Sequence, residues 1–327
     1  MELRFNHKNT KVKQLADYIQ RAISLNELKP GDKLPSINTI SRHYKISRDT
    51  VFKAFNELKS RDLIESIHGK NYYVSYQMKN VLLILDEYTP FKDVLYNTLV
   101  SKLPMNYKID LWFHQYNEHL FNNIVQESYG MYNKYLIMNY SNDMLAESLS
   151  KIDPNKLLLL DFGKFDKAGL SYVCQDFDQG LYDALNEAKE DFKKYKKIVF
   201  LFDKRHKHPQ SSKEYFIKFC FDNNYEFEII DSFTPKTPVI EGTLYIIIKQ
   251  TDVVEVIKRS KIDNLKVGKQ FGIIAYNNNP FYEVIENGIA PISIDWEEMA
   301  NLAAGFVING KQVSQYLPTK IIKRNSY

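Results

Sequence analysis

The chain has 327 residues, of which 44% are hydrophobic and 26% charged, as expected for a globular protein of two or three domains. Its only cysteines, Cys174 and Cys220, argue against a disulfide framework and favour a reducing cytoplasm. No apolar run approaches the ~20 residues that a membrane-spanning helix needs, and the first residues lack the apolar core of a secretion signal, so we expect no membrane partner.

The positive charge is concentrated at the beginning of the chain. Residues 1–80 contain 15 Lys and Arg against 8 Asp and Glu, a net charge of +7, whereas the remaining residues carry −3. Binding to phosphate groups requires a basic region of this kind. A basic surface that is merely solvated would show the same charge, so the charge alone leaves both interpretations open.

Residues 10–60 predict three helices. The first, over residues 10–28, supports the other two, and the turn Pro30-Gly31 follows it. Ser36 can cap a short second helix and Ser47 a third one. The three apolar faces consist of Val12, Leu15, Ile19 and Ile23, of Ile37, Ile40 and Tyr44, and of Val51, Phe55 and Leu58.

The polar start of the third helix predicts a contact with DNA. Arg48, Thr50 and Lys53 lie near this start and off the apolar face. A helix that presents such a turn to the major groove is the geometry of a helix-turn-helix. Two short strands follow, over residues 63–66 and 72–76, and residues 67–71 join them in a hairpin with a basic tip. Helix, turn, helix and hairpin together predict a winged helix, whose tip we expect in the minor groove.

Three blocks in this region resemble the GntR family of bacterial transcription factors. They are PGDKLPS at 30–36, SRDTV at 47–51, and HGK at 68–70 before YYV at 72–74, and the resemblance covers residues 10–76. The sequence departs from the family where Ile37-Asn38 replace the usual Glu-Arg, Phe52 replaces a second arginine and Asn71 replaces a second wing glycine. The resemblance implies a homodimer that binds double-stranded operator DNA through Ser36, Asn38, Ser47, Arg48, Thr50, Lys53, His68, Gly69 and Lys70.

From Val81 onward, apolar strands alternate with amphipathic helices, a pattern typical of parallel sheets covered on both faces. The strands are too many for one compact sheet, so we expect two α/β lobes. We therefore predict a winged helix-turn-helix domain over residues 1–78 and a two-lobed α/β domain for ligand binding and dimerisation over 79–327. The expected strands are 81–86, 108–114, 134–139, 156–161, 171–176, 197–202, 225–230, 243–248 and 271–276, and the expected helices are 91–103, 118–129, 142–150, 178–194, 211–223, 252–259 and 280–287.

The second part resembles the periplasmic-binding-protein-like effector domain of LacI-type repressors. The matching stretches are 81–86 as the first strand, 157–161 closing the first lobe, 172–176 opening the second, 199–202 before a helix from Ser211, 272–277, and the tail 316–324 as a closing strand. The resemblance implies that a ligand binds in the cleft between the lobes. A GntR head on such a domain is a known pairing in sugar-responsive regulators.

Polar and aromatic residues follow the predicted strands, at the sheet edge where α/β proteins bind ligands. A sugar site needs amides and carboxylates for hydroxyl groups and an aromatic face for the ring. By the resemblance, Lys213 stands where related repressors often have a ligand-binding arginine, and Asn277 where they commonly have an aspartate. The predicted ligand-binding residues are Glu87, Tyr88, Phe91, His114, Asn139, Asp176, Lys213, Asp252 and Asn277.

Each of these residues also has an ordinary structural interpretation. A polar residue at a strand end is more often a helix cap or part of a solvated loop. His114 could equally be a buried, hydrogen-bonded histidine, and Asp161 marks the crossover between the lobes. The convergence of several strand ends is what favours a binding site.

Catalytic and metal-binding patterns are weak. His206 and His208 stand in a Lys-rich loop without a cysteine nearby, and no glycine-rich phosphate loop occurs. The chain is shorter than the known fusions of a GntR head to an aminotransferase-like domain, and no cofactor lysine stands in a recognisable setting. We therefore expect no metal, no cofactor and no enzymatic activity.

Two functions remain open. The first is a cytoplasmic transcription regulator whose operator affinity is controlled by a small polar effector, a neutral sugar such as a hexose or a deoxyhexose like fucose. The second is a ligand-independent DNA-binding protein whose large domain serves dimerisation or recruits a partner. The polar residues at the strand ends favour the first function.

Overall fold

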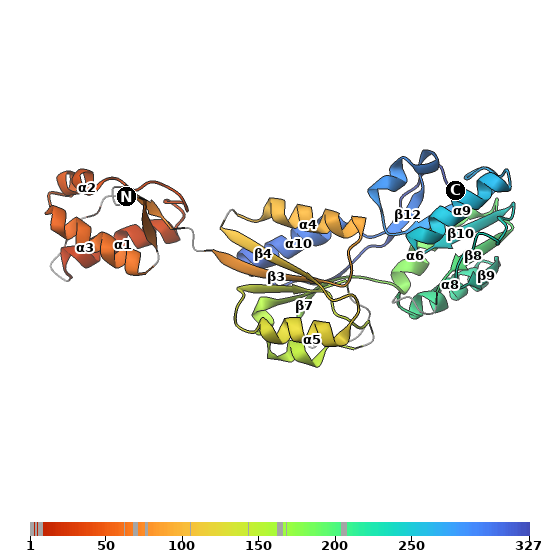
Figure 1. The fold of residues 1–327 in the computed structure, drawn as a ribbon, viewed down its shortest axis with the longest axis horizontal. Helices are drawn as coiled ribbons and strands as arrows, with labels where there is room; N and C mark the ends of the chain where they lie inside the picture. Colours follow the sequence, from red (N-terminus) through yellow and green to blue (C-terminus); the bar gives the residue numbers. More distant parts are fainter. Residues whose placement is uncertain are drawn as a thin grey trace. The chain divides into compact units, whose positions relative to one another are not determined.

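The computed structural model describes residues 3, 5, 9–61, 63–67, 71–75, 78–104, 106–142, 144–161, 166, 167, 169–203 and 208–327 (Figure 1). The predicted wing tip, His68, Gly69 and Lys70, and the histidine at 206 lie outside these residues. The chain divides into two compact units, residues 1–79 with 104–108 and residues 80–103 with 109–327. Within the described part, none of the helices combines the length and the apolar character needed to cross a membrane.

The first unit consists of three helices and a hairpin. α1 (Lys11–Ser24), α2 (Ile37–Tyr44) and α3 (Arg48–Ser60) precede the antiparallel strands β1 (Ile64–Ile67) and β2 (Asn71–Val74). The side chains of Thr10, Ser36 and Ser47 cap the three helices by accepting from backbone N–H groups three residues further on. Lys45 adopts the left-handed conformation after α2 and so ends this helix sharply.

The core of the first unit is built from the apolar faces that the sequence predicts. Leu15 of α1 and Ile40 of α2 are buried with Val51 and Phe55 of α3. The ring of Tyr72 in β2 packs edge-on against Phe55, with ring centroids 4.6 Å apart. The hairpin therefore closes one side of the helices, and the predicted winged helix-turn-helix is confirmed.

The first lobe of the second unit contains a six-stranded sheet in the order β13-β7-β6-β5-β3-β4. Its strands are β3 (Lys79–Leu85), β4 (Tyr107–Phe113), β5 (Lys134–Ile137), β6 (Leu157–Leu160), β7 (Ser171–Gln175) and β13 (Ser314–Leu317). Neighbouring strands from β13 to β3 are parallel. α4 (Pro90–Lys102) and α10 (Trp296–Asn309) lie side by side on one face, and α5 (Glu118–Glu127) covers the other (Figure 1).

The second lobe contains another six-stranded sheet, in the order β14-β12-β11-β10-β8-β9. Its strands are β8 (Lys197–Leu201), β9 (Glu226–Ile230), β10 (Thr243–Ile247), β11 (Gly272–Tyr276), β12 (Ala290–Ser293) and β14 (Lys320–Ile321). α6 (Gln179–Glu187), which the short α7 (Lys189–Phe192) follows, and α8 (Ser211–Asp222) pack on one face. α9 (Gln250–Ile262) packs on the other face, so the sheet is buried on both sides.

The chain passes between the lobes three times, after β7, after β12 and after β13. The hydroxyl group of Thr319 on the third passage donates to the carbonyl oxygen of Asp176 on the first, at 3.4 Å. Three short connections allow the lobes to move as bodies about a common hinge. The predicted fold, a winged helix-turn-helix followed by a two-lobed α/β domain, is confirmed.

Two assignments of strands to lobes are wrong. β7 pairs with β6 and β13 of the first lobe, so residues 172–176 do not open the second lobe and residues 157–161 do not close the first. The tail 316–324 does not form one closing strand, because β13 joins the first sheet and β14 pairs antiparallel with β12 in the second. An apolar pattern identifies a strand but not its partner.

The structure also contains two elements that the sequence does not predict, and two predicted helices are not α-helices. Neither β12 nor α10 was expected. In their described residues, the predicted helices 142–150 and 280–287 contain only 3-10 turns, over Glu147–Lys151, Pro280–Glu283 and Ile285–Asn287. A further turn spans Pro154–Lys156. Glu286 and Asn287 have φ angles of 49° and 61°, which end helical winding at this point.

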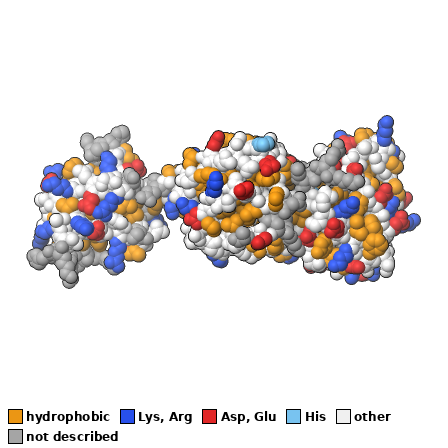
Figure 2. Space-filling view, turned by 90° about the horizontal axis from the view of Figure 1, so that it is seen from below, with side chains coloured by type: hydrophobic (Ala, Val, Ile, Leu, Met, Phe, Trp, Pro, Cys, Tyr) orange, Lys and Arg blue, Asp and Glu red, His pale blue; other side chains and the backbone are white. Residues whose placement is uncertain are grey.

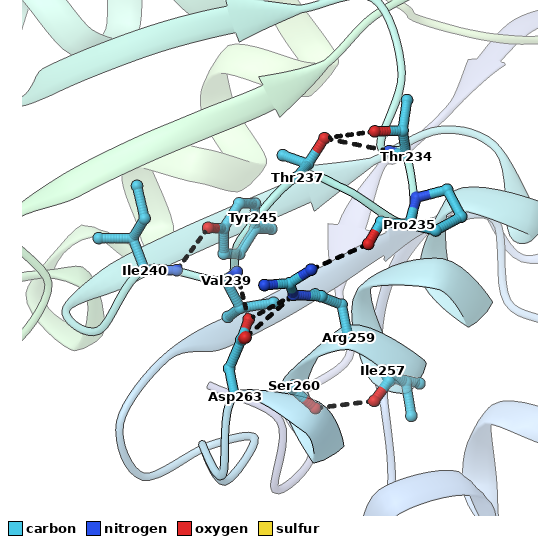
Figure 3. Close-up of polar contacts among 10 residues, drawn as sticks. All are labelled: Thr234, Pro235, Thr237, Val239, Ile240, Tyr245, Ile257, Arg259, Ser260 and Asp263. Carbon is cyan, nitrogen blue, oxygen red and sulfur yellow. Dashed lines mark hydrogen bonds and ion pairs between the residues drawn. The ribbon is translucent and has the colours of Figure 1, made fainter.

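The loop between β9 and β10 is held against the end of α9 by a polar network (Figure 3). The carboxylate of Asp263 accepts from Arg259 Nε and from the backbone N–H of Val239, each at 2.9 Å. Arg259 Nη1 donates to the carbonyl oxygen of Pro235 at 2.9 Å, and the Tyr245 hydroxyl accepts from the N–H of Ile240 at 3.0 Å. A loop without regular structure thereby obtains partners for its backbone groups.

Candidate functional site

A cavity of about 400 Å³ lies between the two lobes of the second unit. Its walls come from the carboxyl ends of β3, β5 and β6 in one lobe and of β8, β10 and β11 in the other, the usual position of a ligand in an open α/β sheet. The volume is in the range of small-molecule sites. The lining residues are Asp86, Glu87, Thr89, Phe91, Lys92, Tyr116, Met138, Asn139, Asn142, Asp161, Phe177, His208, Pro209, Ile248, Lys249, Gln250, Thr251, Tyr276 and Asn277.

A buried ion pair stands on the first-lobe side of the cavity. Asp86 follows β3, and its carboxylate accepts from the ammonium of Lys92, from the Tyr116 hydroxyl at 2.7 Å and from the N–H of Glu87 at 2.6 Å. Burial alone would raise the pKa of Asp86. The positive charge and hydrogen bond of Lys92, and the hydrogen bonds from the Tyr116 hydroxyl and the N–H of Glu87, outweigh burial and hold this pKa below its usual value. Asp86 is therefore a fixed negative charge.

Asp161 and Asn277 present acceptor oxygens to the cavity from opposite lobes. Both residues directly follow strands and have positive φ, 51° and 61°, so the chain turns sharply at each. The Oδ1 atoms of both are buried and have no hydrogen-bond partner among the described residues. Burial raises the pKa of Asp161 to about 7, and burial likewise raises the pKa of Glu87.

Aromatic rings and a second ion pair form the second-lobe side. The His208 ring meets Tyr276 edge-on with centroids 4.6 Å apart and Phe177 with centroids 5.2 Å apart. The Tyr276 hydroxyl accepts from Gln175 Nε2 at 3.3 Å. Lys249, just before α9, pairs with the buried carboxylate of Asp203. The wall thus combines apolar faces, suited to the C–H groups of a sugar ring, with fixed charge.

Four of the nine predicted ligand-binding residues line the cavity: Glu87, Phe91, Asn139 and Asn277. The amide of Asn139 is largely used within its own loop, because its Nδ2 donates to the carbonyl oxygens of Ser141 and Met144, each at 2.7 Å. The ring of Phe91 packs against Trp296 with centroids 4.9 Å apart, so its face is fixed by α10.

Five predicted residues are not among those that line the cavity: Tyr88, His114, Asp176, Lys213 and Asp252. His114 is fully buried and accepts from the N–H of Tyr116 through Nδ1, and burial lowers its pKa to about 4. The Tyr88 hydroxyl donates to Asp93. Asp176 lies on the first passage between the lobes, where its Oδ1 accepts from the N–H of Asp178 at 2.9 Å. Lys213 is in the first turn of α8, and Asp252 is buried in α9.

Several cavity residues were not predicted, above all Asp86, Lys92, Tyr116 and Lys249. The sequence favours a structural role for Asp161 and a weak metal-binding pattern for His208, yet both line the cavity. The strand-end signal extends to Asp86 and Asp161, since each ends an apolar run. In the part of the chain that the structure describes, His, Cys, Asp and Glu side chains form no group of three or more that could hold a metal ion.

The predicted DNA-binding residues lie on α2 and α3 of the first unit. Asn38 and Arg48 are exposed, and Lys53 is exposed and pairs with Asp49 at 2.8 Å. The hydroxyl of Thr50 lies 2.7 Å from that of Ser47, which also caps α3. Lys and Arg side chains are spread over the face of this unit that Figure 2 presents at the left. The polar start of α3 is thus free of the core, as a major-groove contact requires.

The first unit matches a known family. Residues 11–74 fit the family model for bacterial regulatory proteins of the gntR family, so this unit contains a GntR-family helix-turn-helix domain. Over 68 residues the chain is 38% identical to the mannosyl-D-glycerate transport/metabolism system repressor MngR of Escherichia coli (strain K12). The matched segment is 21% of this chain and 28% of that protein. The chain therefore spans little more than a quarter of this relative.

The second unit is similar in fold to solved regulators. The trehalose repressor from Escherichia coli matches with a TM-score of 0.62 and 14% identity, over 75% of this chain and 99% of the other. A LacI family transcriptional regulator from Lactobacillus casei with bound glucose matches with a TM-score of 0.62 and 15% identity. This match covers 76% of this chain and 100% of the regulator. At these identities the likeness establishes the fold.

Proposed function

We propose that this protein is a transcription regulator whose affinity for operator DNA is controlled by a small polar ligand bound between the lobes of the second unit. The observation that carries the proposal is the cavity of a two-lobed domain behind a GntR-family helix-turn-helix. Asp161 lines this cavity from the first lobe and Asn277 from the second, and each has a buried Oδ1 atom without a hydrogen-bond partner among the described residues. Buried acceptors of this kind favour a ligand that donates hydrogen bonds.

The ligand that suits this cavity is an uncharged sugar. Asp86, Glu87 and Asp161 are acidic, and both lining lysines, Lys92 and Lys249, are already paired with aspartates. No arginine stands among the described lining residues. An added phosphate or carboxylate would meet carboxylates without a further cation, whereas hydroxyl groups can donate to every acceptor. The glucose bound to the Lactobacillus casei regulator is consistent with this class of ligand.

The control of DNA binding would arise from closure of the lobes. A sugar that contacts both Asp161 and Asn277 binds the closed arrangement more tightly, and it can shift the equilibrium only by this difference in affinity. We propose that two chains bind an inverted repeat as a homodimer in the cytoplasm, so that closure changes the spacing of their helices α3 relative to the half-sites. The connection at residues 75–80 is short, which favours coupling over independent motion.

The test is a panel of neutral, amino and phosphorylated sugars added to the full-length chain. A specific ligand raises the unfolding temperature by mass action, and the same compound should change the affinity for an operator obtained by selection from random duplexes. Neutral sugars are expected to give the largest shift. A chain that binds the selected operator equally well with every compound, and that none of them stabilises, would instead be a ligand-independent DNA-binding protein.

A further inference from the structure

One residue on the exposed face of α3 is apolar. Phe52 has 46% of its surface exposed, whereas Val51 and Phe55 beside it are buried in the core. Its ring therefore contributes little to the folding of this unit. Single exposed apolar residues are ordinary on protein surfaces, so the position of Phe52, and not its exposure alone, is informative.

Phe52 shares its stripe of the helix with Arg48. Residues four apart lie one above the other on a helix, and Arg48 is exposed at the first position of α3. The neighbouring stripe carries Asp49 and Lys53, which pair with each other at 2.8 Å. Arg48 and Phe52 thus place a cation and an apolar ring one turn apart on the same side of α3. Both lie near the N-terminal end of this helix, the end that a helix-turn-helix inserts into the major groove.

We propose that Phe52 contacts the C5 methyl group of a thymine in the half-site, beside the base that Arg48 reads. This inference rests on the proposed function. A benzene ring offers no hydrogen bond to a base edge, and the thymine methyl is the apolar group that the major groove presents. Four residues of helix rise about 6 Å, which corresponds to about two base-pair steps. The thymine therefore lies within two base pairs of the base contacted by Arg48.

The experiment removes the methyl group without changing the hydrogen-bonding pattern. An operator is selected from random-sequence duplexes with the full-length chain, and each thymine is then replaced in turn by deoxyuridine. The dissociation constant of every duplex is measured for the wild type and for Phe52→Ala. Wild type should lose about fourfold in affinity at one thymine per half-site, the value of one buried methyl group. Phe52→Ala should bind more weakly and should show no such loss.

Two controls separate the possible outcomes. Phe221→Ala removes a more exposed ring, 69%, from α8 of the second unit and should keep the wild-type pattern of losses. Unfolding of Phe52→Ala at the wild-type temperature shows that the first unit remains folded. If no duplex is enriched, the proposed function itself fails. If a duplex is enriched but wild type tolerates deoxyuridine everywhere, or Phe52→Ala keeps the fourfold loss, the inference about Phe52 is overturned and DNA binding stands.

Discussion

The ammonium group of Lys92 forms a buried ion pair with the carboxylate of Asp86 at the wall of the cavity between the lobes. Asp86 is 8% and Lys92 4% exposed, so water screens this pair little. Replacement of one member of such a pair leaves an uncompensated charge in a medium of low polarity. The pair is therefore part of the candidate site, and the first lobe is stable only when both charges are present or both are removed.

Lys92→Met should lower the free energy of unfolding of the second unit by about 3–5 kcal/mol at pH 7. Urea unfolding followed by tryptophan fluorescence reports on this unit, because Trp112 and Trp296 both belong to it. The double variant Asp86→Asn/Lys92→Met, which carries neither charge, should recover most of the loss. A double variant as unstable as Lys92→Met would show that packing, and not charge, stabilises this corner.

Asp161→Asn should stabilise the protein, and the gain should depend on pH. Burial raises the pKa of Asp161 from 3.8 to about 7, so the folded state binds a proton that the unfolded state releases between these values. The contribution of Asp161 to stability is fully present below pH 3.8 and is lost as the pH rises through 7. The variant should therefore exceed wild type by more than about 1 kcal/mol at pH 8 and should match it near pH 4. Equal stability at pH 8 would contradict the buried position of this carboxyl group.

Asn277→Gly removes the proposed ligand contact without straining the backbone, because glycine accepts the φ of 61° found there. The variant should bind the sugar identified by the thermal panel about tenfold more weakly, the value of one or two hydrogen bonds. Isothermal titration of wild type and variant measures the change. Lys213→Ala, at a predicted position that does not line the cavity, is the matched control and should bind as wild type does. Undiminished binding by Asn277→Gly would place the ligand elsewhere.

The sequence predicted best what depends on local chemistry. Ser36 and Ser47 cap α2 and α3 as expected, because a cap needs only its own N–H partners three residues away. Glu87 and Asn277 line the cavity as expected, because each follows a strand, β3 in one sheet and β11 in the other, whose carboxyl end borders the cavity.

Residues that reach the cavity from elsewhere could not be predicted in this way. Lys92 lies in the first turn of α4, and it returns to the strand end because helical side chains point toward the helix N-terminus. The Tyr116 hydroxyl reaches Asp86 because the chain turns sharply at Gln115 and Tyr116, which both have positive φ. Neither residue type favours this backbone conformation, so the turn could not be expected. The partners of β7, which are β6 and β13, are equally unpredictable, since an apolar run does not tell which sheet a strand joins.

Arg48→Ala and Lys53→Ala should weaken DNA binding in different ways. Arg48→Ala should cost about 1–3 kcal/mol on the selected operator and relax its preference at one position, as loss of a guanine contact does. Lys53→Ala should weaken all sequences alike and reduce the dependence on salt concentration, as loss of a phosphate contact does. Lys258→Ala removes a lysine from α9 of the second unit. As the control for the loss of a positive charge outside the helix-turn-helix, it should bind DNA as wild type does. Equal affinities of Arg48→Ala and wild type at physiological salt would refute this placement of α3.

Asp263→Ala should loosen the loop between β9 and β10, because it removes the acceptor for both Arg259 and the N–H of Val239 (Figure 3). The exposed Lys236 in this loop offers a site for trypsin, and cleavage after it should be faster in the variant. The bond from Arg259, and then the N–H of Val239, hold the pKa of Asp263 below its usual value. The network therefore stabilises the loop above about pH 4 and is lost as the pH falls through this lowered pKa.

The same network predicts how the variant and wild type should differ with pH. Their unfolding temperatures should differ at pH 7 and should converge in strong acid, where the carboxyl group is protonated in both states of the wild type. Glu255→Ala on the same helix is the matched control, since it breaks only the exposed pair with Lys258 at 2.9 Å and should change little. If trypsin cuts Asp263→Ala after Lys236 no faster than it cuts Glu255→Ala, the loop is held by the apolar contacts of Phe233 and Val239 with α9 and not by the carboxylate.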